Sequence, residues 1–405
     1  MTGAVILAAG QGTRMRSHRA KVLHELAGKP LLDHVLDQVR ALSLSALVVV
    51  TGYDADRVEA LVEDRARTVR QPGVLGTGDA VRRALSVLDP DVDRVLVLYG
   101  DGPLVPRDLL AQLLEEAEAH DGAVLVTAEM ADPSGYGRIV RGGTGTVVRI
   151  VEEKDAGASE RGIQEINTGI GVWPRRHLER ILPDLPEHGQ EQYLTDAVAA
   201  LLDNGVAVTT ILAPEPERVM GINTRAQLAQ AEAILRRDTL GRLMEAGVTL
   251  LDPATTFIDP EVVIGMDTVI QPMTTIRGHT TIGEGARIGP MATIVDSELG
   301  DQVVVGPSVI EGSRLMAHVS VGPYSHLRAG TYLERDVHIG NYVELKNARM
   351  GLGSKAGHHC YLGDVTIGSH VNIGAGTVVV NYDGVHKHPT FIGDDAFIGC
   401  NVNLV

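Results

Sequence analysis

The chain has 405 residues, of which 44% are hydrophobic and 22% charged, a composition that suits two or three globular domains. Its formal net charge of −16 disfavours binding to nucleic acid or to an anionic membrane. Cys360 and Cys400 are the only cysteines and lie far apart, which excludes a disulfide framework or a cysteine zinc site and favours a cytoplasmic location. Aromatic residues make up only 3%, which indicates a repetitive scaffold of small aliphatic side chains.

Residues 1–224 alternate short aliphatic segments with amphipathic ones, which predicts a mostly parallel, Rossmann-like α/β domain. The N-terminal apolar run is too short to cross a bilayer and is expected to be a buried strand. The expected strands are Ala4–Leu7, Ala46–Val50, Val95–Tyr99 and Ala123–Thr127. The expected helices include Leu31–Leu42 and Pro106–Ala119, with Pro106 in the first helical turn. Residues 225–247 are rich in helix formers and are expected to form a linking helix.

Residues 248–405 carry an aliphatic residue at every sixth position over long stretches, often followed directly by glycine. Such a hexapeptide repeat predicts a left-handed parallel β-helix, in which each short strand turns one aliphatic side chain inward. The repeated positions are Ile264, Ile270, Ile276, Ile282, Ile288 and Ile294, then Val321, Leu327, Leu333, Ile339 and Leu345, then Ile367, Ile373 and Val379, and finally Ile392, Ile398 and Leu404.

The segment NYDGVHKHPT, Asn381–Thr390, interrupts this period. Solenoids accommodate insertions as loops on one face, often the binding face. The loop could be decorative, but Tyr382, His386, Lys387 and His388 favour a functional one.

A glycine-rich segment, LAAGQGTRMRSHRAK, spans Leu7–Lys21 directly after the first expected strand. Such a turn lets backbone N–H groups approach phosphates closely. It is not a Walker A motif, because the G-K-[ST] ending is absent, and it lacks the third glycine of a dinucleotide fingerprint. Arg14 and Lys21 would supply the fixed positive charges that a triphosphate requires. We therefore predict a phosphate-binding site here.

This segment closely resembles the signature of the sugar-nucleotide pyrophosphorylases. Further segments narrow the resemblance to the bifunctional N-acetylglucosamine-1-phosphate uridyltransferase/glucosamine-1-phosphate acetyltransferases, and it runs almost end to end. They are QPGVLGTGDA (Gln71–Ala80), LYGDGPL (Leu98–Leu104), GYGRI (Gly135–Ile139), VEEKDA (Val151–Ala156), EINTGI (Glu165–Ile170), GINTR (Gly221–Arg225), SKAGH (Ser354–His358) and NYDG (Asn381–Gly384).

The resemblance implies roles for individual residues of the N-terminal domain. A glutamine amide can read uracil with one donor and one acceptor. The implied groups are a uridine and phosphate site of Leu7, Ala8, Ala9 and Gly10, uracil contacts from Gln71, Gly76 and Thr77, a strand end at Tyr99, Gly100 and Asp101, and amino-sugar contacts from Gly137, Glu152 and Asn167.

The resemblance also implies a Mg²⁺ ion shared by Asp101 and Asn223. From the residues alone, Asp101 could instead cap a strand, and Asn223 could be a turn or helix N-cap residue. In the implied reaction, N-acetylglucosamine 1-phosphate attacks the α-phosphorus of UTP and expels pyrophosphate, while Mg²⁺, Arg14 and Lys21 neutralise charge.

Two positions depart from the family pattern. Asp79 stands where relatives commonly carry histidine, and Gly102 replaces a larger residue. Neither is expected to touch a ligand, so both should affect local packing more than activity.

A second site is predicted in the repeats, where basic and polar residues recur about one coil or less apart and could form a single wall: Arg328, Lys346, His358, Tyr361, Asn372 and Lys387. The resemblance implies that Arg328, Lys346 and Lys387 bind the phosphate of glucosamine 1-phosphate, and that Tyr361 and Asn372 contact the sugar. His358 would be the general base, because an imidazole titrates near neutrality. His359 competes with it from spacing alone.

The resemblance places acetyl-CoA along Ala375, Asn381, Tyr382 and Cys400. Relatives usually carry serine at the last position, and a thiol is a weaker hydrogen-bond donor. The chain ends at NVNLV in mid-repeat, whereas the resemblance implies about two or three further coils that contribute coenzyme A contacts. Solenoid acyltransferases of this kind form trimers, so a homotrimer is expected.

Two other interpretations stay open. A pyrophosphorylase with a single activity and a purely structural β-helix is one, although Glu152, Asn167 and the basic wall argue against it. A regulatory subunit without catalysis is the other, and Gly10, Arg14, Lys21 and Asp101 argue against that.

Overall fold

The computed structural model describes residues 1–405 and divides into two units, Met1–Glu232 and Ala233–Val405, called the head and the tail below. The division falls within helix α8 (Arg225–Glu245), which matches the helix expected there. No helix of the chain has both the length and the apolar character that a membrane crossing requires.

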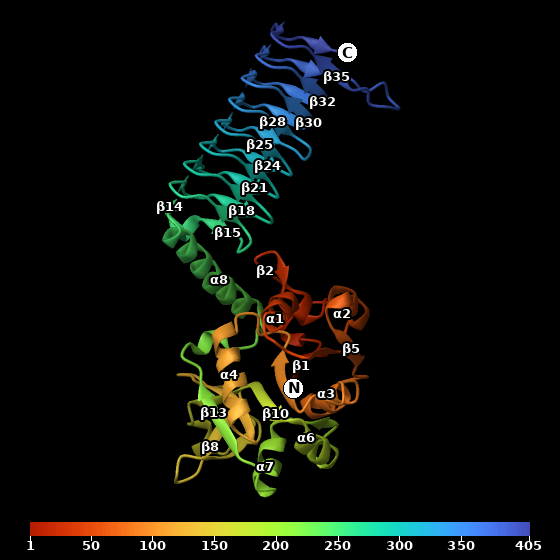
Figure 1. Ribbon diagram of the computed structural model, residues 1–405, viewed down its shortest axis with the longest axis vertical. Coiled ribbons are helices and arrows are strands. Elements are labelled where there is room, and N and C mark those ends of the chain that lie inside the picture. Colours follow the sequence, from red (N-terminus) through yellow and green to blue (C-terminus); the bar gives the residue numbers. More distant parts are fainter. The chain divides into compact units, whose positions relative to one another are not determined.

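The head is built on a mixed sheet in the order β13-β7-β10-β6-β1-β4-β5 (Figure 1). The expected parallel arrangement holds for β1, which is parallel to β4 and β6, and for β5 beside β4. Strand β10 is the exception within the main sheet, because it runs antiparallel to both β6 and β7. The main strands are β1 (Thr2–Ala8), β4 (Ala46–Thr51), β5 (Arg67–Arg70), β6 (Arg94–Tyr99), β7 (Ala123–Glu129), β10 (Glu165–Pro174) and β13 (Val208–Leu212).

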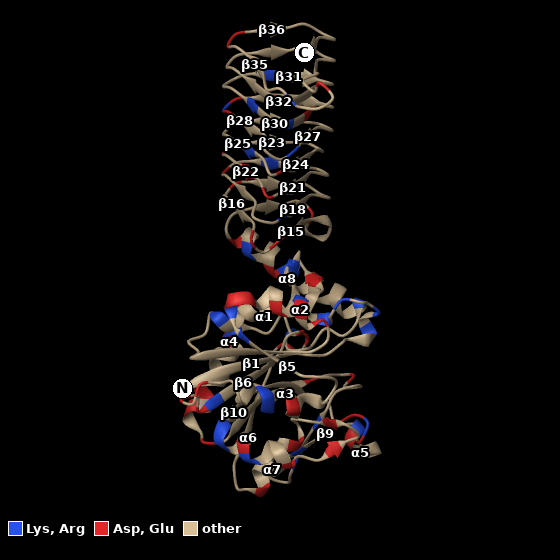
Figure 2. Ribbon diagram, turned by 90° about the vertical axis from the view of Figure 1, so that its right-hand side faces the viewer, with Lys and Arg blue, Asp and Glu red and all other residues tan.

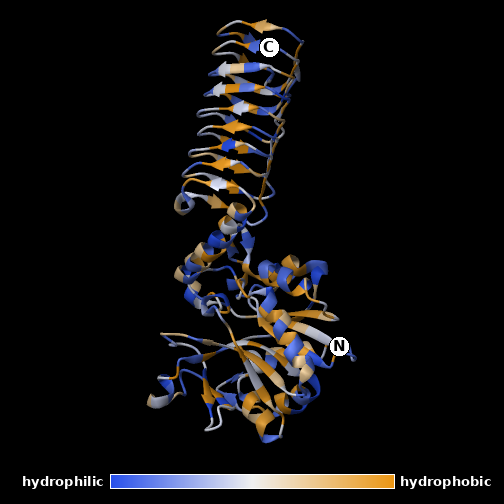
Figure 3. Cartoon of the chain, turned by 60° about the vertical axis from the view of Figure 1, so that its left-hand side comes forward, coloured by the Kyte–Doolittle hydropathy of each residue, from blue (hydrophilic) through white to orange (hydrophobic).

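Alternate residues of β1 enter two separate cores, one on each face of the sheet. Ile6 packs in the core covered by α1, α2 and α4, while Val5 and Leu7 pack in the core covered by α3, α6 and α7. Figure 3 shows apolar strands of this sheet beside helices that carry both apolar and polar residues. A strand buried on both faces reads as a continuous apolar run, which is why β1 was recognisable from the sequence.

The helices of the head begin and end close to their expected positions. Helix α1 ends two residues before the expected limit at Leu42. Helix α4 begins after Pro106, whose backbone is extended (φ −66°, ψ 135°), so Pro106 precedes the first turn and the expectation for it is wrong by one residue. The helices are α1 (Leu31–Arg40), α2 (Ala55–Val62), α3 (Gly76–Leu85), α4 (Arg107–Ala119), α5 (Ala158–Arg161), α6 (Arg175–Ile181) and α7 (Asp196–Asp203).

Short strands complete the head. A hairpin of β8 and β9 attaches to β10, and two further pairs of short strands stand apart from the main sheet. These strands are β2 (Glu25–Leu26), β3 (Lys29–Pro30), β8 (Arg138–Arg141), β9 (Val147–Val151), β11 (Glu187–His188) and β12 (Glu191–Gln192).

The tail is a parallel β-helix, and the hexapeptide prediction is confirmed. Its coils stack so that each strand pairs in parallel with the strand one coil away, as Figure 1 shows. Most of its ribbon carries no charged residue in Figure 2. One face consists of β14 (Thr249–Leu250), β17 (Val269–Ile270), β20 (Arg287–Ile288), β23 (Val304–Val305), β26 (Ser320–Val321), β29 (His338–Asn341), β31 (Lys355–His358), β33 (Asn372–Ile373) and β36 (Phe397–Ile398).

The remaining strands of the tail form a second, larger sheet that wraps around the coils. They are β15 (Phe257–Ile258), β16 (Val263–Ile264), β18 (Thr275–Arg277), β19 (Thr281–Ile282), β21 (Thr293–Val295), β22 (Glu298–Leu299), β24 (Val309–Glu311), β25 (Arg314–Leu315), β27 (His326–Leu327), β28 (Tyr332–Leu333), β30 (Glu344–Met350), β32 (Tyr361–Ile367), β34 (Val378–Val379), β35 (Thr390–Ile392) and β37 (Asn403–Leu404).

The aliphatic residues on the six-residue period fill the interior of the tail. All of those expected up to Val379 are buried in one core, while Ile392, Ile398 and Leu404 are partly buried against it. Where the period slips, the coil has a shorter corner: buried Leu299 follows Ile294 by five residues instead of six. The expected insertion is present, because Ile392 pairs with Ile367, 25 positions earlier, whereas Ile282 pairs with Ile264, 18 positions earlier.

Candidate active sites

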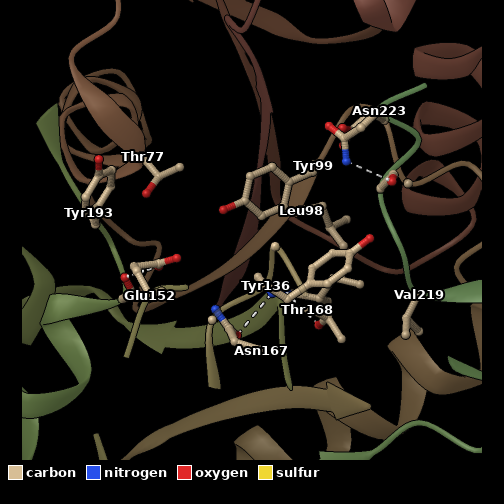
Figure 4. Close-up of a pocket in the computed structure, with 18 of the residues that line it drawn as sticks. Thr77, Leu98, Tyr99, Tyr136, Glu152, Asn167, Thr168, Tyr193, Val219 and Asn223 are labelled. Atoms are coloured by element: carbon tan, nitrogen blue, oxygen red, sulfur yellow. Dashed lines mark hydrogen bonds between the residues drawn. The ribbon is translucent and has the colours of Figure 1, made fainter. Parts of the chain in front are cut away.

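Two neighbouring cavities open at the carboxyl ends of β1 and β6 in the head. The larger has a volume of about 520 Å³ and the smaller about 270 Å³. Ligands of α/β sheets bind at such strand ends. In Figure 4 the ring of Tyr99 lies between Thr77 and Asn223. Both cavities are lined by Lys21, Thr77, Tyr99, Asp101 and Tyr193.

The smaller cavity gathers the residues expected to bind the nucleotide. A side chain at position 76 would be excluded there, because a Cβ atom on Gly76 would lie 2.2 Å from the carbonyl oxygen of Gln192, at a φ of +87°. Glycine at position 76 therefore lets the backbone of Gln192 lie close to the N-terminus of α3. The expected residues that line this cavity are Leu7, Ala8, Ala9, Gly10, Lys21, Gln71, Gly76, Thr77, Tyr99 and Asp101.

Gln71 lines this cavity with a buried amide that the protein already holds. Its Nε2 donates to the carbonyl oxygen of Gly76 at 2.9 Å and to Oδ2 of Asp79 at 2.9 Å. Both N–H donors are therefore used within the protein, and only Oε1 remains for a ligand. The expectation that this amide offers both a donor and an acceptor to uracil is wrong for the donor.

Asp79, the first of the two departures, is 2% exposed and sits in the first turn of α3. Burial alone would raise the pKa of its carboxyl, but hydrogen bonds from Arg83, Gln71 and Arg82 outweigh burial and lower it. Asp79 thus holds a residue of the expected uracil site, which was not foreseen from the sequence. The second departure, Gly102, lines the larger cavity.

Lys21, Asp101 and Asn223 meet where the two cavities join. The ammonium group of Lys21 forms an ion pair with Asp101, which is 6% exposed, and donates to Oδ1 of Asn223 at 2.9 Å. A carboxylate and an amide oxygen therefore converge on one cation. No group of three or more His, Cys, Asp or Glu side chains is arranged to hold a metal ion by itself.

The N-terminus of α8 shows whether Asn223 caps the helix or is available as a metal ligand. Thr224, not Asn223, caps the helix, because Oγ1 of Thr224 accepts from the backbone N–H of Gln227 at 3.2 Å. In return Oε1 of Gln227 accepts from the N–H groups of Asn223 and Thr224 at 2.8 and 3.0 Å. The side chain of Asn223 is thus left free to turn its oxygen toward Lys21.

The larger cavity contains the residues expected to contact the amino sugar: Gly137, Glu152 and Asn167. Oε1 of Glu152 accepts a hydrogen bond of 2.8 Å from the hydroxyl of Thr195. Oδ1 of Asn167 accepts from the N–H of Gly169 at 3.1 Å, drawn as a dashed line in Figure 4. Both polar side chains are therefore oriented by neighbours within the head.

Tyr99 lines both cavities, and the position of its ring depends on a neighbouring glycine. A Cβ atom on Gly169 would lie 2.1 Å from Cε2 of Tyr99, and Gly169 has a φ of +78°. Burial raises the pKa of the Tyr99 phenol, and the carboxylates of Glu152 and Asp101 raise it further. The phenol is therefore neutral and can donate as well as accept a hydrogen bond.

Two expected residues of the head do not line either cavity. Arg14 is exposed on the short helix Thr13–Met15. Gly100 is buried behind the cavities, where a Cβ atom would press on Val22 and Leu32 at 3.1 and 3.2 Å. Gly100 thus allows close packing below the site.

Several lining residues were not expected. Tyr136 and Gly221 lie within segments that carried the resemblance, so position within a motif was their only signal. Lys154 does too, and its ammonium group donates to the hydroxyl of Tyr193 at 2.9 Å. Tyr193 and Thr195 lie outside every recognised motif and have no sequence signal.

In the tail, the basic wall is formed by consecutive coils. Arg328 and Lys346 follow the paired residues Leu327 and Leu345, and so lie one above the other on neighbouring coils. Lys387 reaches this wall from the inserted loop and forms an ion pair of 3.2 Å with Asp364. The amine of Lys387 lowers the pKa of Lys346, and the carboxylate of Asp364 raises that of Lys387. The wall therefore concentrates positive charge around one carboxylate.

Tyr361 lies on β32, the strand that pairs with β30, which carries Lys346. A Cβ atom on Gly363 would lie 2.4 Å from the hydroxyl oxygen of Tyr361, and Gly363 pairs with Lys346. The missing side chain at position 363 therefore leaves room for the phenol directly above the wall.

His358 and His359 occupy different environments. Nδ1 of His358 lies 2.8 Å from Oδ1 of Asn341, the residue it pairs with one coil earlier. His359 has a φ of 44° and forms the corner itself. The hydrogen bond to Asn341 leaves Nε2 of His358 as the free ring nitrogen.

Asn372 is not on the wall. It lies on β33 and pairs with Lys355 and Phe397 in the sheet that also carries His358 on β31, so the expectation of a single wall is wrong for Asn372 and His358.

Of the residues expected along acetyl-CoA, Tyr382 and Cys400 are exposed. The amide of Asn381 instead anchors the inserted loop by donating to the carbonyl oxygens of Gly363 and Asp364 at 3.0 and 3.2 Å. Ala375 lies at the neighbouring corner, where its carbonyl oxygen accepts from the N–H of Asn401 at 2.7 Å.

The nucleotide-sized cavities at the strand ends and the β-helix together define a nucleotidyltransferase joined to a hexapeptide acyltransferase. Residues 4–197 match the MobA-like NTP transferase domain, and residues 261–295 match the bacterial transferase hexapeptide (six repeats). The chain belongs to the family of bifunctional GlmU proteins. The resemblance to the bifunctional uridyltransferase/acetyltransferases is thereby confirmed.

Curated relatives carry the name "Bifunctional protein GlmU". The one from Heliobacterium modesticaldum is 46% identical over 99% of this chain and 88% of its own length. The one from Exiguobacterium sibiricum is 45% identical over 99% and 90%, and the one from Symbiobacterium thermophilum is 46% identical over 99% and 86%.

Proposed function

We propose that the head transfers the uridylyl group of UTP to N-acetylglucosamine 1-phosphate, giving UDP-N-acetylglucosamine, a cell-wall precursor, and pyrophosphate. The smaller cavity would hold the nucleoside and the larger one the amino sugar. The observation that carries this assignment is the meeting of Lys21, Asp101 and Asn223 at the junction of the two cavities. Two substrates entering from the two cavities would bring their phosphates together there.

We propose that Asp101 and Asn223 hold a Mg²⁺ ion. The fit is supported by their chemistry, because both offer hard oxygen atoms, and by Lys21, a cation that already contacts both oxygens. When bound, Mg²⁺ would neutralise the triphosphate and the charge that develops on leaving pyrophosphate.

The reaction needs positioning and charge neutralisation, and no protein nucleophile. An oxygen of the sugar phosphate forms a bond to the α-phosphorus of UTP as the bond to pyrophosphate breaks. Lys21 would neutralise phosphate oxygens at the junction. Arg14 would contact the triphosphate from outside the cavity, which its exposed position on the short helix allows. Gly137, Glu152 and Asn167 would orient the sugar.

We propose that the tail transfers an acetyl group from acetyl-CoA to glucosamine 1-phosphate. Arg328, Lys346 and Lys387 would bind the phosphate, and Tyr361 would contact the sugar. Nε2 of His358 would take a proton from the sugar ammonium, and the free amine would attack the thioester carbonyl. A C–N bond forms, the C–S bond breaks, and coenzyme A leaves. Ala375, Asn381, Tyr382 and Cys400 would line the coenzyme path.

We further propose that the chain works as a homotrimer in the cytoplasm, with residues 1–224 and 248–405 as catalytic domains and 225–247 as the linking helix. The position of Asn372 supports the trimer. Asn372 lies on β33, in a different sheet from the strands that carry Lys346 and Tyr361, so we assign it to the sugar held by the basic wall of a neighbouring copy.

The experiment uses the purified chain and measures pyrophosphate release and thiol release separately. We expect pyrophosphate from UTP and N-acetylglucosamine 1-phosphate with Mg²⁺. Asp101→Ala should abolish this release and leave thiol release unchanged, while His358→Ala should do the reverse. If UTP gave pyrophosphate with glucose 1-phosphate but not with N-acetylglucosamine 1-phosphate, the single-activity pyrophosphorylase would be favoured. Loss of both activities in either variant would contradict two separate sites.

A further inference from the structure

Asp79 is a buried carboxylate to which the proposed reaction assigns no role. It accepts three hydrogen bonds: from Nε2 of Gln71 at 2.9 Å, from Nη2 of Arg82 at 2.6 Å and from Nε of Arg83 at 2.7 Å. An ionised carboxylate only accepts hydrogen bonds, and the two arginines hold Asp79 in that form. The group facing it must therefore be the NH₂ of Gln71.

The carbonyl oxygen of Gly76 enforces the same orientation from a second direction, at 2.9 Å from Nε2. If the amide of Gln71 turned over, its oxygen would face two acceptors, and two hydrogen bonds would be replaced by two repulsive contacts. Gln71 is only 6% exposed, so water cannot compensate. The amide orientation is therefore fixed, and Oε1 is the atom left for the smaller cavity.

We propose that Asp79 is a positioning residue that determines which pyrimidine the head accepts. It presents Oε1 of Gln71 to the cavity as a pure hydrogen-bond acceptor. This inference rests on the proposed role of Gln71 as the residue that reads the base. Uracil offers one N–H donor on its pairing edge, at N3, whereas cytosine has a lone pair at N3. An acceptor fixed opposite N3 therefore favours UTP and repels CTP.

The experiment compares kcat/KM for UTP and for CTP, with N-acetylglucosamine 1-phosphate as the acceptor. Asp79→Leu removes the carboxylate and keeps the branched shape and number of side-chain heavy atoms, and Asp79→Asn keeps an oxygen that accepts from Gln71. We expect the UTP-to-CTP ratio to fall about five- to tenfold in Asp79→Leu, the effect of one hydrogen bond, and to change less than about threefold in Asp79→Asn. Asp79→Ala, which leaves room for water, replaces the leucine variant if that variant does not fold.

Asp33→Asn is the matched control. Asp33 is also a largely buried aspartate on a helix of the head, and it pairs with Arg65 at 2.5 Å, but it lines neither cavity. This variant should change stability and leave the ratio as it is. The ratio is the deciding readout, because a purely structural role for Asp79 would lower kcat/KM for both nucleotides equally.

Gln71→Ala tests the uracil contact of Gln71 separately from the positioning role of Asp79. A reduced ratio in both Gln71→Ala and Asp79→Leu supports the proposal. An unchanged ratio in folded Asp79→Leu, together with a reduced ratio in Gln71→Ala, overturns the positioning role of Asp79 alone. An unchanged ratio in Gln71→Ala overturns the uracil contact on which the inference rests.

Discussion

The hydroxyl of Thr195 donates a hydrogen bond of 2.8 Å to Glu152, and through this contact the segment before α7 reaches the larger cavity of the head. The same segment reaches the smaller cavity, because the N–H of Leu194 donates to Oγ1 of Thr77 at 2.9 Å, and Tyr193 lines both cavities. Residues 193–195 therefore connect the two cavities of the head, although no sequence motif marks them.

The first prediction concerns this contact. Thr195→Val removes the hydroxyl that orients Glu152 and keeps the shape of the side chain. We expect KM for N-acetylglucosamine 1-phosphate to rise about five- to tenfold, corresponding to roughly 1 kcal/mol, with KM for UTP nearly unchanged. Steady-state kinetics with each substrate varied in turn would check this.

Thr209→Val serves as its control. Oγ1 of Thr209 is buried on β13 and has no hydrogen-bond partner, so its removal leaves no group unsatisfied. Both KM values should stay at the wild-type level in this variant. Equal effects of the two substitutions would show that Glu152 does not depend on Thr195.

The second prediction concerns the glycine beneath Tyr99. Gly169→Ala should push the phenol out of place, because the new Cβ atom would lie 2.1 Å from the ring. We expect uridylyl transfer to fall at least tenfold, together with a loss of stability of about 2 kcal/mol or more. Gly189→Ala isolates the backbone cost, since Gly189 has a similar φ of +76° and no atom within 4 Å of the added Cβ. It should cost about 1 kcal/mol and leave activity intact.

The third prediction is a pH dependence of stability at β10, the strand that carries Asn167. Burial alone would raise the pKa of Glu165, but its paired hydrogen bonds from Arg141, at 2.7 and 2.6 Å, outweigh burial and lower it. A carboxyl with a lowered pKa in the folded state stabilises above its ordinary value of 4.5, and this contribution is lost as the pH falls through the lowered pKa.

Glu165→Gln should therefore lower the free energy of unfolding by roughly 1 kcal/mol at pH 7. The difference from the wild type should shrink as the pH falls below the ordinary pKa of the carboxyl. Urea unfolding at several pH values would measure it. Glu118→Gln, at an exposed position of α4, should show no such trend. A difference that grows in acid would contradict the assignment.

The fourth prediction concerns the base in the tail. Asn341→Asp places a carboxylate beside Nδ1 of His358 and favours the protonated ring, so the acidic limb of the acetyl-transfer profile should move to higher pH. Asn341→Ala should lower kcat about tenfold, because the ring loses its orientation. Thiol release measured across pH would test both, and pyrophosphate release should be unaffected. An unshifted acidic limb in the aspartate variant would argue against His358 as the base.

The sequence predicted the parts of the fold that repeat or are buried on both faces. The aliphatic column of the tail could be read directly, because each inward residue recurs on one period. The five-residue corners, such as Ile294 to Leu299, could not be predicted in this way. A corner that is one residue shorter still turns an aliphatic side chain inward, but it interrupts the six-residue period in the sequence. The antiparallel direction of β10 could not be predicted from the sequence, because strand direction depends on pairing partners far along the chain.

For the sites, the sequence could name residues but not assign their hydrogen bonds. Gln71 was expected in the uracil site, yet the use of its two N–H groups depends on Asp79 and Gly76, which only the folded turn of α3 brings to it. The motif that contains Gly100 predicts a ligand contact, whereas in the structure Gly100 packs closely against Val22 and Leu32. The spacing of the repeat predicts Asn372 on the basic wall, but it lies in the other sheet of the tail.

The stacking of the tail has a consequence for how damage spreads through it. Ile288 pairs with Ile270 in the coil before it and with Val305 in the coil after it, and this pattern of neighbours repeats along the solenoid. A disruptive substitution would be felt by the adjoining coils and fade beyond them. Local unfolding would therefore spread from one coil to the next. The basic wall is built from residues of successive coils, so it would be lost if the pairing between any two of those coils were broken.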